Sequence, residues 1–157
     1  MLRSDYLKKS GKSKIQETLA EYAFLKDLLI DGVRKEKKVL ISRSDFDEFG
    51  YDVLVQIEGE QRVVKLQLKA FNGKARNWDV HKSLIEDPEG NVVVIKLVEG
   101  DNSIDFEYST LYKTDGKTII ERAAKIPKEN KCKVIKGDLV QVEANELLKK
   151  VLNYDSL

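Results

Sequence analysis

One stretch, GYDVLVQIEGEQRVVKLQLKA at positions 50–70, constrains the fold of this chain more than any other. Two runs rich in alternating apolar residues flank a glycine, which is the pattern of two strands joined by a tight turn. A two-residue turn at Gly59-Glu60 sets the register and pairs Val53 with Leu66. The sequence therefore predicts an antiparallel hairpin with one apolar face.

Three polar residues interrupt this apolar pattern: Asp52, Gln67 and Lys69. The same register places Asp52 opposite Gln67, and strand alternation puts Lys69 on the face that Gln67 occupies. Carboxylate and amide oxygens are the ligands that Mg²⁺ prefers, and a lysine beside them can position a water or stabilise a charged transition state. The hairpin is therefore a candidate metal-dependent hydrolytic site.

A helix is predicted over residues 14–30, ended by Asp31-Gly32. Glu21 falls on the same apolar stripe as Phe24, and Glu17 lies one turn earlier on nearly the same line. A carboxylate on such a stripe needs a partner, which could be a metal, a lysine or a proton. The alternative is that Glu21 lies at the edge of the stripe and reaches water.

The rest of the chain supplies further short elements. We expect strands at 39–41, 91–98, 104–111, 132–135 and 139–142, an exposed loop at 71–90 with one helical turn near 81–85, and helices at 117–126 and 144–154. Together they predict an α/β (α+β) fold, with a central mixed sheet of four to five strands flanked by helices. The 157 residues fit a single domain, with the core motifs in 11–98 and a C-terminal elaboration in 99–157.

Composition excludes several classes of protein. The single Cys and single His cannot form an internal disulfide or a zinc site, and the absence of a long apolar run argues against a membrane span, so we expect a cytoplasmic protein. The net charge is +1, but residues 45–60 carry six acids and no base, whereas 113–136 carry eight bases and three acids. This patterning fits a cation-binding centre flanked by phosphate-binding surface, or an ordinary solvated surface.

Glu21, the GYD segment with Asp52, and the QLK segment with Gln67 and Lys69 together resemble the PD-(D/E)xK nuclease superfamily, in particular its Q-x-K branch. The resemblance covers about residues 11–70. It implies a restriction-endonuclease-like core, a catalytic site built from these four residues, and metal binding by Asp52, Gln67 and Glu21. Lys69 would be the catalytic lysine.

The resemblance also implies a function, namely hydrolysis of DNA phosphodiester bonds by a Mg²⁺-dependent endonuclease, with Mn²⁺ as a substitute. Cutting both strands of a duplex commonly needs two sites, which implies a homodimer or higher oligomer. Two residues depart from the family pattern: Tyr51 stands where the family name has Pro, and Gln67 replaces an acid. The alternatives are a nuclease-fold module without catalysis that binds nucleic acid or a protein, and an unrelated α+β protein in which Asp52 and Lys69 form a salt bridge.

Secondary candidates flank the motif. Lys74, Arg76 and Lys82 surround Trp78 after the second strand of the hairpin, which suits phosphate contact and base stacking. The alternative is that Trp78 covers the edge of the core. Asp47, in the loop before the motif, is a candidate ligand for a second metal.

Overall fold

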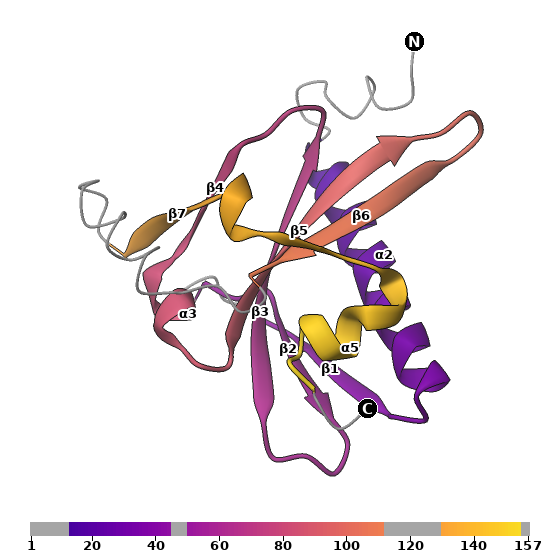
Figure 1. The fold of residues 1–157 in the computed structure, drawn as a ribbon, viewed down its shortest axis with the longest axis vertical. Coiled ribbons are helices and arrows are strands. Elements are labelled where there is room, and N and C mark those ends of the chain that lie inside the picture. Colours follow the sequence, from indigo (N-terminus) through magenta and orange to yellow (C-terminus); the bar gives the residue numbers. More distant parts are fainter. Residues whose placement is uncertain (1–12, 45–49, 112–129, 155–157) are drawn as a thin grey trace.

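The computed structural model describes residues 13–44, 50–111 and 130–154 (Figure 1). The elements in chain order are α2 (Ser13–Arg34), β1 (Val39–Arg43), β2 (Val53–Ile57), β3 (Val63–Asn72), β4 (Asn77–His81), α3 (Lys82–Glu86), β5 (Gly90–Glu99), β6 (Ile104–Thr110), β7 (Lys131–Ile135), the 3₁₀ turn η2 (Lys136–Asp138), β8 (Val140–Val142), the 3₁₀ turn η3 (Ala144–Glu146) and α5 (Leu147–Lys150).

The main sheet has six strands in the order β1-β2-β3-β5-β6-β8. Among the described strands only β3 and β5 pair in parallel, so the sheet is mixed and mostly antiparallel. The predicted α+β class is confirmed, but the predicted count of four to five strands is too low. The three-residue strand β8 adds an edge beside β6.

The hairpin register is confirmed, because Val53 faces Leu66 and the ladder continues in that register to Gln56 and Val63. The predicted two-residue turn is wrong. The N–H of Glu60 donates to the carbonyl of Ile57 at 2.9 Å, so the tight turn is centred one residue earlier and a longer loop leads into β3. Gly59 occupies a left-handed conformation with φ of +89°, as a turn of this kind requires.

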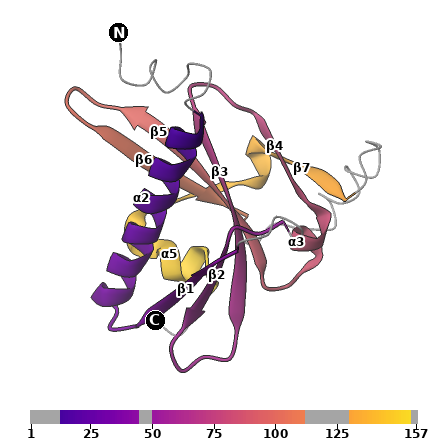
Figure 2. The ribbon, with the colours of Figure 1, turned by 180° about the vertical axis from the view of Figure 1, so that it is seen from behind.

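Two cores lie on opposite faces of the main sheet. On one face, α2 and α5 pack on inward side chains of β2, β3 and β5, with Phe24 and Leu28 fully buried. On the other, β4, β7 and α3 cover Val92 and Val94. Figures 1 and 2 show α2 on one side of the sheet and the β4–β7 pair on the other.

The helical turn expected near 81–85 is present as α3, but the prediction that the rest of 71–90 is an exposed loop is wrong. β3 continues to Asn72, and Asn77–His81 forms β4, which pairs antiparallel with β7 in a separate two-stranded sheet. Val80 is buried there. Five residues of mixed polarity give little strand signal on their own, and their partner lies about fifty residues later in the chain.

The first helix also runs past its predicted end. Asp31 is completely buried and accepts hydrogen bonds from Lys35 Nζ (2.6 Å) and from the backbone N–H of Leu148 (2.9 Å), which ties α2 to α5. The helix ends four residues later than Ile30, where Glu36 adopts a φ of 55° and the N–H of Lys37 donates to a carbonyl of the last turn.

The predicted closing helix at 144–154 is shorter, consisting of η3 and α5. The helix predicted at 117–126 lies outside the described residues. In the part of the chain that the structure describes, no helix is both long enough and apolar enough to cross a membrane.

Candidate active site

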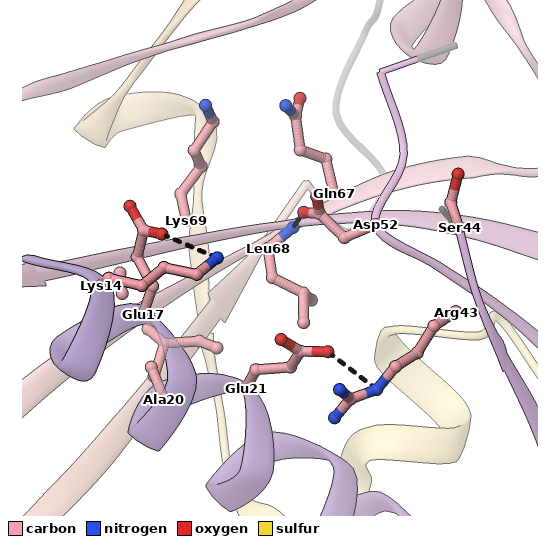
Figure 3. Close-up of a pocket in the computed structure, with 12 residues that line it drawn as sticks. Lys14, Glu17, Ala20, Glu21, Arg43, Ser44, Asp52, Gln67, Leu68 and Lys69 are labelled. Carbon is pink, nitrogen blue, oxygen red and sulfur yellow. Dashed lines mark hydrogen bonds and ion pairs between the residues drawn. The ribbon is translucent and has the colours of Figure 1, made fainter. Parts of the chain in front are cut away.

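A pocket of about 510 Å³ opens where the first turns of α2 meet the ends of β1 and β3 (Figure 3). Its polar lining holds three cationic side chains, three carboxylates and one amide: Lys14, Arg43, Lys69, Glu17, Glu21, Asp52 and Gln67. All four residues of the predicted site therefore line one pocket, although they come from α2, the turn before β2, and β3.

Strand alternation divides these residues between two sides of β3. Figure 3 shows Gln67 and Lys69 projecting from β3 in the same direction, while Leu68 points the opposite way, toward Ala20 and Glu21 of α2. The prediction that Gln67 and Lys69 share a face matches this arrangement. Glu21 approaches from the other face of the strand.

Gln67 carries the most unusual atom of the pocket. The residue is only 6% exposed, and its Oε1 is the one buried side-chain polar atom without a hydrogen-bond partner among the described residues. Leaving a buried acceptor unsatisfied costs about 1–3 kcal/mol. Folded proteins satisfy most such atoms, so this oxygen marks a place in the polar pocket where a water or a bound ion can complete the bonding.

Asp52 is fixed by the backbones of its neighbours. Its Oδ2 accepts a hydrogen bond of 2.6 Å from the N–H of Leu68, the residue between Gln67 and Lys69. The N–H of Asp52 donates to the carbonyl of Leu66 at 2.8 Å, one residue away from the direct pairing with Gln67 that the sequence predicts. Asp52 therefore lies just outside β2, with its carboxylate anchored between the two polar side chains of β3.

Glu21 has a partner that the sequence did not predict. Its Oε1 lies 3.3 Å from Nε of Arg43, the last residue of β1, and the guanidinium of Arg43 also lies 5.1 Å from the ring centroid of Tyr22. The partner is thus an arginine, where the sequence suggested a metal, a lysine or a proton. Arg43 is the last residue of β1 and pairs with Val53, the residue after Asp52. This position next to the motif is the feature of the sequence that could have indicated Arg43.

Glu17 forms an exposed pair with Lys14, at 3.8 Å. Asp47 lies outside the described residues. No group of three or more His, Cys, Asp and Glu side chains suited to a metal gathers within residues 13–44, 50–111 and 130–154. The oxygens of Asp52 and Gln67, one carboxylate and one orphaned amide, nevertheless have the chemistry of a site for a hard cation that keeps several waters.

The four predicted nucleic-acid residues lie in three different settings. Lys74 and Arg76 are exposed on the connection between β3 and β4. Lys82 pairs with Glu86 at 3.7 Å on α3. Trp78 packs against the ring of Phe71, with centroids 5.3 Å apart, as part of the second core. The structure therefore favours the core-edge role of Trp78 over base stacking.

No family model and no curated protein matches this sequence. Among solved structures, the chain is similar to the Holliday junction resolvase Hjc of Archaeoglobus fulgidus, an archaeal hyperthermophile, with 11% identity and a TM-score of 0.38 over 81% of this chain and 93% of that one. It is also similar to a bacterial homing endonuclease, I-Ssp6803I, with 15% identity and a TM-score of 0.35 over 80% of this chain and 77% of the other. Overlaps this weak do not establish a common fold.

Proposed function

We propose that this chain is a divalent-metal-dependent endonuclease that hydrolyses phosphodiester bonds of DNA. The single observation that carries the proposal is Gln67 Oε1, a buried oxygen without a partner among the described residues, on the same strand face as Lys69 and in the pocket that Asp52 also lines. The restriction-endonuclease-like motif order, with Glu21 on the first helix, supports the same assignment.

Asp52 and Gln67 would hold the cation, Mg²⁺ or Mn²⁺, and the negative charge of Glu21 would support it from the α2 side of β3. When bound, such a cation lowers the pKa of a ligated water and neutralises charge on a scissile phosphate. Gln67 contributes an oxygen without a negative charge, so the site carries one charge fewer than a site with three acids. We therefore expect weaker binding of Mg²⁺ than in a three-acid site of the same shape.

Lys69 supplies the positive charge of this strand face. No ion pair joins it to any described residue, which leaves its ammonium group available to a phosphate. In hydrolysis, a water oxygen bonds to phosphorus, one ester P–O bond breaks, and the leaving oxygen takes a proton. Lys69 would orient the attacking water and stabilise the charge that develops on the phosphoryl oxygens.

Cations on the elements that follow β3 would hold the DNA. Lys74 and Arg76, on the β3–β4 connection, and Lys82 of α3 are suited to sequence-independent contacts with the phosphate backbone. Cleavage at a particular sequence or branched structure would require base or shape contacts in addition. Two copies of the chain would provide the two sites that double-strand cleavage needs.

The test is cleavage of supercoiled, linear and branched DNA by purified protein with Mg²⁺ or Mn²⁺. Asp52→Ala and Lys69→Met are each expected to reduce the rate of DNA cleavage about 10²-fold or more. The first removes a metal ligand, and the second removes the positive charge that stabilises the transition state. Lys38→Met is the matched control, because Lys38 is exposed and pairs only weakly with Glu58, at 3.9 Å. Cleavage that survives both pocket substitutions would refute the proposal.

One observation favours a second candidate, a binding module without catalysis. Glu21 is already paired with Arg43, so one acid of the motif is neutralised within the protein. Such a module would bind DNA with an affinity that falls as salt rises, and would not cleave with either cation. Arg43→Gln separates the two: it frees Glu21 and should strengthen Mn²⁺ binding by a nuclease, whereas a module without a metal site should show no Mn²⁺ binding before or after the change.

A further inference from the structure

The outward side of α2 is apolar, which is unusual for a helix that covers one face of a sheet. Figure 2 shows α2 lying in front of the sheet, with no other described element over its outer side. Large apolar side chains follow that side and are well exposed: Ile15 (41%), Leu19 (39%), Tyr22 (56%), Leu29 (44%) and Val33 (76%). The opposite side of the same helix carries the buried residues Phe24 and Leu28. A helix that is apolar on two sides is expected to be covered on both.

The spacing of the exposed residues is that of a coiled-coil seam. Positions 15, 19, 22, 26, 29 and 33 alternate steps of four and three, which is the a/d pattern of the heptad repeat. At 100° per residue they all lie within roughly 40° of one line along the helix. Lys26 is the only polar member, and its side chain is 65% exposed.

The seam is also complementary to itself when reversed. If two copies of α2 pack antiparallel about a two-fold axis at position 24, Ile15 meets Val33 of the other copy, and Leu19 meets Leu29. In the same register, Lys26 meets Tyr22. We propose that this chain forms a homodimer through an antiparallel α2–α2 coiled coil in this register. Each contact occurs twice, as a two-fold interface requires.

The pairs of facing residues form layers along the seam, and the central layer, Lys26 with Tyr22 of the other copy, explains why a lysine lies in an apolar seam. A single polar residue at an a position specifies register and oligomeric state in coiled coils, at some loss of stability. In the proposed pairing the ammonium group of Lys26 can lie over the ring of Tyr22 from the other copy, as a cation–π contact. Any shift of register would bring Lys26 against an aliphatic residue instead, so Lys26 selects this alignment.

The seam also adjoins the candidate active site. Within each chain, Arg43 lies over the ring of Tyr22 and pairs with Glu21. The central layer of the dimer therefore packs directly against the arginine that holds the acid of the pocket. The pairing itself depends on the surface of α2 and stands whether or not the chain cleaves DNA.

The interface is small. Standard protein interfaces involve about 20–30 residues on each side, whereas the seam offers six positions and their immediate neighbours on one helix. We therefore expect a dimer that dissociates on dilution, with dissociation in the micromolar range or weaker, and not an obligate one.

Sedimentation equilibrium of the full chain over a wide range of concentrations tests the pairing. The wild type should show a monomer–dimer equilibrium, and Leu19→Lys or Leu29→Glu alone should weaken it at least tenfold, because each buries a charge against leucine. The double variant Leu19→Lys/Leu29→Glu should restore dimerisation, since antiparallel layers then join lysine to glutamate. The matched control Leu19→Lys/Leu29→Lys should remain monomeric. A parallel pairing would instead juxtapose like charges in the restored variant.

Both leucines are substantially exposed in the single chain, so circular dichroism and thermal melts should show folded monomers for every variant. Ile15→Cys/Val33→Cys provides a second measurement. These positions are about 27 Å apart along one helix, so oxidation can join them only between copies, giving a disulfide-linked dimer on a non-reducing gel. A wild type that is monomeric at every concentration, a charge pair that fails to restore association, or the absence of cross-linked dimer would each overturn the pairing. Loss of DNA cleavage with dimerisation intact would count against the proposed function alone.

Discussion

Replacing Gln67 with Met separates the structural and functional consequences of its orphaned oxygen. Methionine keeps the unbranched shape and approximate volume of glutamine but offers no ligand oxygen suited to Mg²⁺. Gln67 is 94% buried, so the substitution replaces a polar side chain by an apolar one in a largely enclosed place. Because Oε1 has no hydrogen-bond partner among the described residues, its removal should raise the free energy of unfolding of the metal-free protein.

The expected magnitude follows from the cost of an unsatisfied buried acceptor, about 1–3 kcal/mol. We expect a gain near the lower end, about 1 kcal/mol in EDTA, because the amide nitrogen is lost as well. For a chain of this size that gain corresponds to a rise in Tm of about 2–4 °C. With Mg²⁺ at about one hundred times its Kd, the wild type should gain about 2.7 kcal/mol and the variant should lose most of that gain.

The assay is urea or thermal unfolding with EDTA and again with MgCl₂. Gln56→Met is a matched control, since Gln56 lies on the neighbouring strand and its Nε2 donates to the carbonyl of Glu60 at 2.6 Å. That control should lose a little stability in EDTA and keep the full response to Mg²⁺. Two results would contradict this role of Gln67: a loss of about 1 kcal/mol or more by Gln67→Met in EDTA, or an unchanged response of that variant to Mg²⁺.

Two further predictions concern stability. Asp31→Ala should destabilise the fold by about 3–5 kcal/mol, because it leaves Lys35 without its buried partner, whereas Glu58→Ala on the surface should change chemical-denaturation stability by less than about 0.5 kcal/mol. The hydrogen bond from Lys65, at 2.6 Å, holds the pKa of Asp87 below its ordinary value of 3.8. The depressed pKa stabilises the fold above about pH 4, and that contribution is lost as pH falls through the folded-state pKa. The stability difference between wild type and Asp87→Asn, about 1 kcal/mol or less, should therefore shrink below pH 4, and a constant difference would contradict this pairing.

Local patterns predicted the hairpin and its register, because period-two alternation and a turn glycine act over only a few residues. The shared face of Gln67 and Lys69 follows from the same local geometry. The exact turn did not, since Gly59 can occupy either central position of a tight turn with similar ease. Asp52 bonds to Leu66 and not to its predicted partner Gln67, because the regular ladder of the hairpin ends at Val53.

What the sequence did not predict depends on contacts between distant parts of the chain. Asp31 resembles a helix stop, but its carboxylate binds Lys35 and the backbone of α5, and the helix continues past it. The strand at 77–81 needs β7 as its partner; the sequence predicted β7 as a strand at 132–135, but nothing local marked 77–81 as the strand that pairs with it. Likewise, the pairing of Glu21 with Arg43 requires α2 to lie beside the end of β1.

The proposed function depends above all on a divalent cation held by the oxygens of Asp52 and Gln67. Crystals soaked in Mn²⁺, with anomalous diffraction collected at the manganese edge, test it directly. We expect one strong anomalous peak with Asp52 and Gln67 Oε1 as protein ligands, and none at that place in Gln67→Met crystals. A wild-type pocket open to solvent but without that peak, or with Gln67 Oε1 bonded to another protein group, would show that these oxygens do not hold a cation.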